Sequence, residues 1–126
     1  MDFNGAIGTA TNGILGTLTV NAGGDTSGGN ITFATAADVG TATAAGAASL
    51  VIGNGSTATL AINGADYNTS GVQTYTANAF TLSGTDPDFN TTNSNVSFVD
   101  GATSDIVLSN SANLEINTGS GTGTID

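Results

Sequence analysis

The large apolar residues of this chain occur in short blocks, most of which alternate apolar and polar residues. Gly, Asn, Ser or Asp residues bound each block, a pattern typical of half-buried strands between turns. No apolar stretch is long enough to span a bilayer as a helix. The pattern therefore predicts an all-β protein. The predicted strands are 18–20, 31–33, 50–52, 60–62, 80–82, 96–98, 106–108 and 114–116.

Small residues limit how thick the core of such a protein can be. Gly, Ala, Ser, Thr and Asn make up two thirds of the 126 residues, and the chain has no Trp. Disordered chains combine low hydropathy with high charge, whereas only 8% of this chain is charged and its mean hydropathy is +0.13. We therefore expect residues 1–126 to form one folded module with a thin core.

Two all-β architectures fit these blocks. A parallel β-solenoid (β-helix) stacks small residues and Asn in its coils and needs few large side chains per coil. An antiparallel β-sandwich, of jelly-roll or Ig-like type, uses similar blocks at regular spacing. Here the spacing mixes short and long steps, which suits coils that carry more than one strand. We favour the solenoid and keep the sandwich as the alternative.

Turn signals separate the blocks. Asn-Gly pairs at 4–5, 12–13, 54–55 and 63–64 predict tight turns. The Ala-rich run 34–48 is the one helix candidate, but its Gly and Thr residues favour strand–turn–strand, or one short helical turn near Ala36. The sole proline, Pro87, predicts a turn or loop over 85–88.

The chain has no Lys, Arg, His or Cys, and ten carboxylates give it a formal net charge of −10. Without cations it cannot neutralise the phosphates of nucleic acid or bind an anionic membrane through a basic patch. Without imidazole or thiol it lacks the commonest proton shuttle and soft nucleophile. We therefore expect no enzyme activity, no nucleic-acid partner and no membrane insertion.

The carboxylates allow one metal hypothesis. Asp86, Asp88, Asp100 and Asp105 lie in or near predicted turns, and Ca²⁺ accepts Asp and carbonyl oxygens in loops. The alternative is that these aspartates cap turns and keep the surface soluble. No cofactor other than calcium is expected from the sequence. Glu115, the only glutamate, lies mid-strand where alternation points it away from the core, so a glycosidase-like carboxylate pair is not expected.

Thr-x-Thr pairs provide a further signal, because residues i and i+2 of a strand share one face. Stacked pairs would build a flat Thr surface of the kind that ice-binding β-solenoids use. The simpler interpretation is that Thr suits solvent-facing strand positions. The pairs are Thr9/Thr11, Thr17/Thr19, Thr41/Thr43, Thr57/Thr59, Thr74/Thr76 and Thr122/Thr124.

A family resemblance is carried by residues 63–76, which read Asn-Gly-Ala-Asp-Tyr-Asn-Thr-Ser-Gly-Val-Gln-Thr-Tyr-Thr, and by 79–82. This stretch resembles the repeats of secreted bacterial proteins of the filamentous-haemagglutinin or autotransporter-adhesin kind, and residues 29–33 and 95–102 are similar to neighbouring repeat segments. The resemblance implies a right-handed β-helix, an outer-surface or secreted location, and adhesion or fibre formation without catalysis. Tyr67, Tyr75, Phe80 and Phe98 are expected to pack in the core or across strands.

These inferences predict an extracellular structural module of a cell-surface fibre or adhesin, with a calcium-stabilised surface-layer domain as one alternative. Its partner would be a second copy or a neighbouring repeat, because open sheet edges can be completed by another subunit. We expect residues 1–14 and 118–126 to pair between subunits. Glycans and host or abiotic surfaces are candidate targets of adhesion. Because each subunit carries −10, assembly should weaken at low ionic strength.

Overall fold

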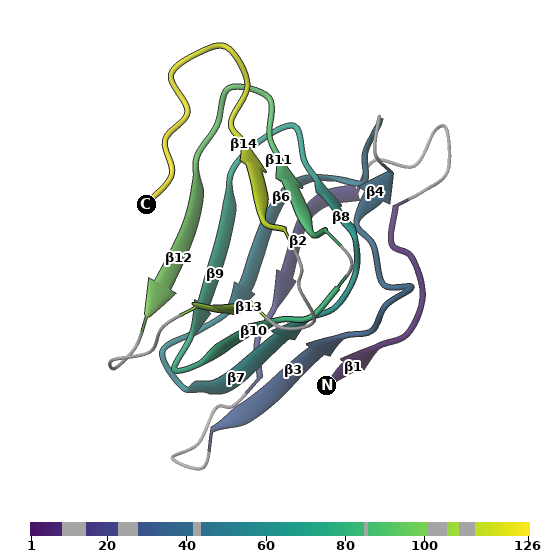
Figure 1. Cartoon of the computed structure of the whole chain (residues 1–126), viewed down its shortest axis with the longest axis vertical. Helices are drawn as coiled ribbons and strands as arrows, with labels where there is room; N and C mark the ends of the chain where they lie inside the picture. The colour runs from purple at the N-terminus through teal and green to yellow at the C-terminus, as the bar shows by residue number, and fades with distance from the viewer. Residues whose placement is uncertain (9–14, 23–27, 42–43, 85, 101–105, 109–112) are drawn as a thin grey trace.

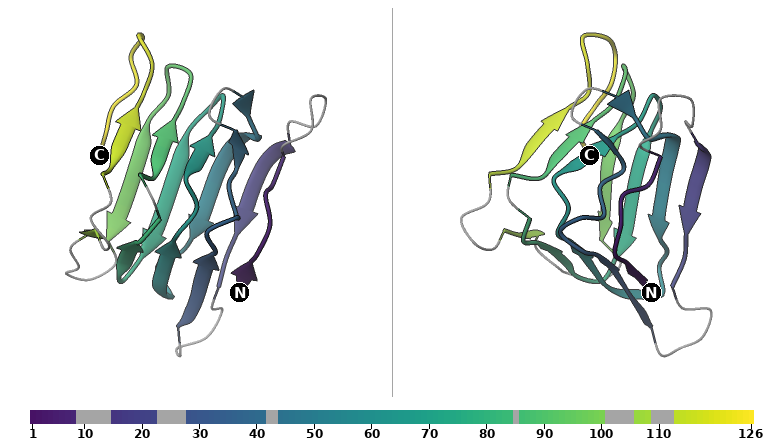
Figure 2. Two further views of the ribbon diagram at one scale, coloured as in Figure 1. Left: turned by 45° about the vertical axis from the view of Figure 1, so that its right-hand side comes forward. Right: turned by 90° about the vertical axis from the view of Figure 1, so that its right-hand side faces the viewer.

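The protein is a parallel β-solenoid of about four turns, which confirms the favoured architecture over the sandwich (Figure 1). Each coil contributes, in order, to three parallel sheets that we call A, B and C. The coils stack in chain order, so the two termini lie at opposite ends of the stack (Figure 2). The computed structural model describes residues 1–8, 15–22, 28–41, 44–84, 86–100, 106–108 and 113–126.

Each sheet takes one strand from successive coils. Sheet A contains β1 (Asp2–Phe3), β3 (Gly29–Phe33), β7 (Thr57–Ile62), β10 (Phe80–Leu82) and β13 (Ile106–Leu108). Sheet B contains β8 (Asp66–Asn68), β11 (Asp88–Asn90) and β14 (Glu115–Asn117), and parallel bridges extend it to Val39 and Ile7. Sheet C contains β2 (Leu15–Val20), β6 (Ala47–Gly53), β9 (Gln73–Ala77) and β12 (Val96–Asp100).

The predicted strand blocks all lie in sheets A, B and C. The last block is shifted by one residue, because β14 begins at Glu115 and not at Leu114. Sequence reasoning missed β8, β9 and β11. The prediction of a turn or loop over 85–88 was wrong for Asp88, which begins β11 directly after the buried Pro87. Proline can precede a strand because its missing N–H is not needed in the ladder there.

The Ala-rich run is a strand–turn–strand segment, as favoured from the sequence. Ala37 N donates to Ala34 O at 2.8 Å, which closes one turn. The chain then forms a short antiparallel pair, β4 (Gly40–Thr41) with β5 (Ala44–Ala45), before it enters β6. This pair is a local hairpin at one corner of the solenoid.

A glycine determines the corner between sheets C and A in the second coil. Gly53 has a φ of 80°, and a Cβ there would clash with the carbonyl oxygen of Thr76 in the next coil. The turn predicted at Asn54-Gly55 follows directly, and the Asn54 side chain accepts the Ser56 N–H at 2.9 Å. The left-handed residue is therefore Gly53, because the corner needs both positive φ and close approach of two coils. The Asn12-Gly13 pair lies outside the described residues.

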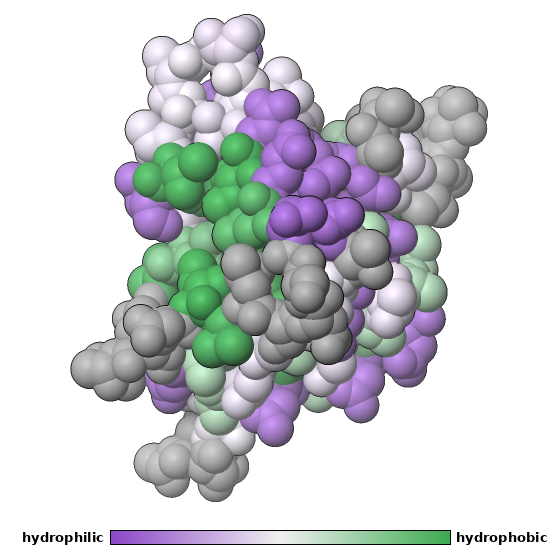
Figure 3. Space-filling view, viewed as in Figure 1, coloured by the Kyte–Doolittle hydropathy of each residue, from purple (hydrophilic) through white to green (hydrophobic). Residues whose placement is uncertain are grey.

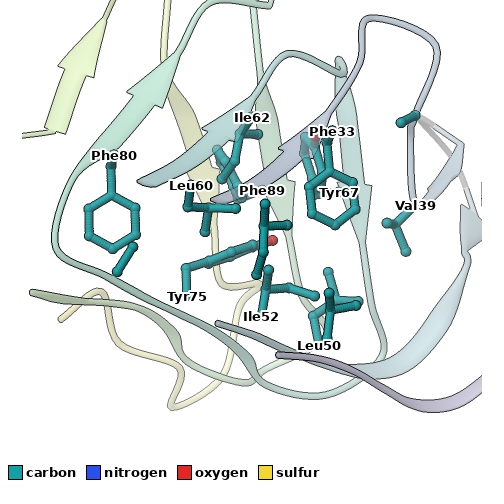
Figure 4. Close-up of a cluster of buried hydrophobic side chains, with 14 of the residues drawn as sticks. Phe33, Val39, Leu50, Ile52, Leu60, Ile62, Tyr67, Tyr75, Phe80 and Phe89 are labelled. Carbon is teal, nitrogen blue, oxygen red and sulfur yellow. The ribbon is translucent and has the colours of Figure 1, made fainter. Parts of the chain in front are cut away.

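The core consists of in-register columns of inward-pointing side chains, one residue per coil. One column follows sheet B as Ile7, Val39, Tyr67, Phe89 and Ile116. Aromatic rings at its centre contact those of sheet C (Figure 4). Tyr67 and Phe89 stack at 5.1 Å, as do Tyr75 and Phe98. The expectation that Tyr67, Tyr75, Phe80 and Phe98 pack in the core or across strands is confirmed.

Candidate functional surfaces

A row of carboxylates follows the outer face of sheet B. Asp66, Asp88 and Glu115 are paired neighbours on β8, β11 and β14. Asp38 precedes Val39 as Asp66 precedes Tyr67, so the row begins one coil earlier. Neighbouring parallel strands lie about 4.8 Å apart, which brings like charges close together. The first coil carries Ala6 at this level, next to Ile7. We call Asp38, Asp66, Asp88 and Glu115 the acid row.

The pKa of Asp88, a member of the acid row, is raised above its ordinary value. The largest cause is burial, which disfavours the charged carboxylate, followed by the negative charges of Glu115, Asp66 and Asp86. Asp88 lies in the middle of the row and has a carboxylate neighbour in the coil on each side. Repulsion along the row therefore opposes the stacking of coils at neutral pH.

Of the four predicted calcium ligands, only Asp86 and Asp88 have described side chains, so the calcium site stays a prediction. Asp86, at a φ of 50°, accepts hydrogen bonds from the backbone N and the Nδ2 of Asn113 at 3.1 and 3.0 Å. Asp88 belongs to the acid row, and Asp100 ends β12 in sheet C. Asp105 lies outside the described residues. Among the residues that the structure describes, no three acidic side chains are grouped so that they could hold a metal ion.

Side-chain capping is a structural role of two aspartates. Asp38 Oδ1 accepts the N–H groups of Ala65 and Asp66 in the next coil, at 2.7 and 3.1 Å. Asp86 binds Asn113 one coil further on in the same way. Each carboxylate thus satisfies backbone donors at a corner where the strand ladder is interrupted.

A four-residue repeat underlies the acid row. In each of the last three coils, four consecutive residues are an acid, an apolar residue, Asn and Thr. The two earlier coils have Gly in place of Asn, and the first of them also has Ala6 in place of the acid. A pattern of alternating apolar blocks does not include this repeat, because each copy has a single apolar residue, although the repeat is visible in the sequence. The five segments are 6–9, 38–41, 66–69, 88–91 and 115–118.

The Asn and Thr of this repeat line a shallow polar cavity of about 250 Å³ beside β5. The Asn68 amide donates to the carbonyl oxygen of Thr41. Thr69 Oγ1 donates to Gly71 O at 2.6 Å, and Thr91 Oγ1 donates to Ser94 O. These side chains therefore serve to hold the corner between sheets B and C. The cavity is lined by Ala44, Ala45, Asn68, Thr69, Asn90, Thr91 and Thr92.

Gln73 is the centre of a buried polar network at the same corner. Its Nε2 donates to Tyr67 O at 2.7 Å and to Asn90 O at 2.9 Å, which ties β9 to two successive coils. Its Oε1 accepts the Tyr75 hydroxyl at 2.8 Å. Burial raises the pKa of both Tyr75 and Tyr67 well above the usual value, so both hydroxyls stay protonated; the Tyr75 hydroxyl donates to Gln73, and the Tyr67 hydroxyl accepts the Gly64 N–H at 3.0 Å. The network satisfies polar atoms inside the core.

Threonine pairs do not align from coil to coil on the described faces. Thr57 is buried, and its hydroxyl donates to Ala22 O at 3.2 Å. Thr9, Thr11 and Thr43 lie outside the described residues. The described threonines therefore do not form the regular array that the ice-binding alternative requires. Across sheet C the outer rows are Thr19–Val51–Thr74–Ser97 and Gly53–Thr76–Val99.

Both ends of the stack present strand edges. Among the described residues, β1 pairs only with β3 and β13 only with β10 in sheet A, and β2 pairs only with β6 in sheet C. At the C-terminal end, Ile125 bridges Val96 on β12, and Phe98 N donates to Asp126 O at 2.9 Å. One edge of the 118–126 segment is therefore used within the chain.

The C-terminal end is also apolar. Ile106, Val107 and Ile125 are 38%, 51% and 57% exposed. In the view of Figure 3, apolar side chains gather over β13 and around β14, beside a polar region. Core columns thus reach this end without a polar cover among the described residues.

Comparison with protein-family models, with curated proteins and with solved structures finds no match. The described residues contain no helix that is long and apolar enough to cross a membrane. Fold and surface are therefore the basis for any functional assignment.

Proposed function

We propose that this chain is a non-catalytic structural module of an extracellular fibre or adhesin, and that it acts by stacking end to end. The observation that carries the proposal is the pair of open ends: within the part of the chain that the structure describes, the solenoid ends at strand edges with no further partner at both ends. An unpaired edge offers backbone N–H and C=O groups to another strand, and stable proteins cover or blunt such edges.

Apolar exposure at the C-terminal end supports the same proposal. Ile106 and Ile125 extend core columns to the surface, because they pair with the buried Phe80 and Val96 of the preceding coil. A further coil stacked on this end would bury them and complete their ladders, as each coil does for the one before it. Stacking would leave the side faces of the solenoid exposed. These faces would then contact adhesion targets such as glycans or abiotic surfaces.

The test is association of the purified full chain. We expect sedimentation velocity to give species that grow with protein concentration, and negative-stain micrographs to show rods. Association should increase with ionic strength, because salt screens the repulsion between copies of charge −10. A monomer at every protein and salt concentration would refute the proposal.

A matched pair of variants locates the contact. Ile106→Thr removes apolar surface from a core column at the C-terminal end, and Val72→Thr makes a similar change at a residue of similar exposure on a side face. We expect Ile106→Thr to weaken association by roughly fourfold to fifteenfold, from ~0.8–1.6 kcal/mol for one to two buried carbon groups. Val72→Thr should associate like the parent. Equal effects of the two variants would contradict a contact at the end of the stack.

A further inference from the structure

We propose that the stacking is head to tail, with the first coil of one copy on the last coil of another, and that outer-face charges set this polarity. The inference rests on the proposed function, because it specifies which end of a second copy contacts each open end.

A second copy can be placed beyond the C-terminal end so that each residue column of the sheets continues in register. This placement determines which residues of the two copies would be neighbours. In sheet B the column ends at Ile116 and begins at Ile7. In sheet C it ends at Ile125 and begins at Leu18. A second copy that continues the register therefore places Ile7 beside Ile116 and Leu18 beside Ile125. Both junction contacts are apolar on apolar, as in the core columns.

The outward-facing rows of sheets A and B have a carboxylate at one end and an uncharged residue at the other. In sheet A the row that begins at Asp2 ends at Val107. In sheet B the row that begins at Ala6 ends at Glu115. Head-to-tail stacking puts each terminal carboxylate beside an uncharged residue, Asp2 by Val107 and Glu115 by Ala6.

The two homotypic arrangements lack this complementarity. A tail-to-tail pair brings two Glu115-bearing edges together, and a head-to-head pair brings two Asp2-bearing edges together. Like charges directly opposite across paired strands are destabilising. The chain has no Lys or Arg to compensate them. Among the described carboxylates of the strand rows, only the head-to-tail contact avoids this repulsion, and because it is heterologous it propagates into a filament.

Directed disulfides test the polarity, since the chain has no cysteine of its own. Thr17 and Thr124 are exposed, and the sheet C register places Thr17 of one copy beside Thr124 of the next. Strands one coil apart lie about 4.8 Å from each other, within the roughly 4.4–6.8 Å between Cα atoms that a disulfide accepts.

The experiment mixes the isotope-labelled Thr17→Cys variant of the whole chain with the unlabelled Thr124→Cys variant under mild oxidation. Mass spectrometry then measures the masses of the disulfide-linked dimers. We expect the mixed dimer to dominate. Val72→Cys in place of Thr124→Cys is the matched control, because residue 72 lies two coils from the C-terminal end, and it should give no mixed dimer. Association with mainly Thr124→Cys or Thr17→Cys homodimers would overturn the polarity while leaving stacking intact. Absence of association would overturn the proposed function itself.

A charge variant tests the cause. Ala6→Asp extends the acid row into the first coil, and the exposed Ala6 has room for the change. We expect it to weaken head-to-tail association about two- to fivefold, and Glu115→Gln in the other copy to restore it. Ser70→Asp, an exposed side-face residue, adds the same charge away from the junction and should have a smaller effect. Equal weakening by Ala6→Asp and Ser70→Asp would overturn the role of the acid row.

Discussion

Phe89 holds the centre of the core, and its truncation should cost more stability than any similar change at the ends. Its ring is fully buried, stacks on Tyr67 at 5.1 Å, and meets Tyr75 and Phe98 edge to face at 5.3 Å each. These contacts join sheets B and C across two successive coils. Phe89→Ala removes the ring that all three partners share.

The expected cost follows from burial and cavity formation. Replacing a fully buried Phe by Ala in a packed core costs about 3–5 kcal/mol, from lost transfer free energy plus the cavity left behind. A domain of this size is stable by about 5–15 kcal/mol, so Phe89→Ala should remain folded but close to its limit. Urea unfolding followed by far-ultraviolet circular dichroism, at protein concentrations that keep the chain monomeric, measures the difference.

Phe3 is the matched control. It is half-buried in β1 at the N-terminal end, and its described ring contact is Phe33 at 4.8 Å. Phe3→Ala should therefore cost about 1–2 kcal/mol, because less surface is returned to water. Phe3→Ala could lower the free energy of unfolding as much as Phe89→Ala does, with the slope of that free energy against urea concentration unchanged. This result would refute the reasoning that the aromatic centre dominates stability.

Three further changes have defined outcomes. Gly53→Ala should strongly lower the thermal unfolding temperature, because residue 53 has a positive φ and its new Cβ would clash with the backbone of Thr76. Gly55→Ala should leave this temperature nearly unchanged, because a Cβ at residue 55 has open space around it. Gln73→Leu should cost about 1–3 kcal/mol by urea unfolding, because buried carbonyls and a tyrosine hydroxyl lose their partner. Asp88 has a pKa above its ordinary 3.8, so its protonation favours the folded state; this contribution is fully present below 3.8 and is lost as pH rises through the folded pKa. Asp88→Asn should flatten that pH dependence, and an unchanged slope would contradict it.

Local pattern was enough to predict much of the fold. Blocks such as Ile31–Phe33 and Phe80–Leu82 alternate strictly, and each lies in a strand with its apolar residues inward. The same alternation correctly pointed Glu115 away from the core, and it is exposed. These predictions succeeded because the two-residue period of a strand is a local property.

The functional surface could be predicted only in part. Asp88 was assigned with Asp86 to a loop calcium site, yet it lies in a strand between Asp66 and Glu115. Neighbours in this row are a full coil apart in sequence, and coil lengths differ. Only the stacking register shows which carboxylates are adjacent.

The sequence by itself determined the all-β class, the short strands and a thin core of small and aromatic residues, because composition and two-residue periodicity act locally. It also determined the acidic surface and the lack of any cationic side chain to balance it. The tertiary structure decided which coil lies on which, and with that the aromatic centre around Phe89, the Gln73 network and the acid row. Register between coils depends on corner geometry at residues such as Gly53 and on packing across coils, and neither is encoded in any single segment.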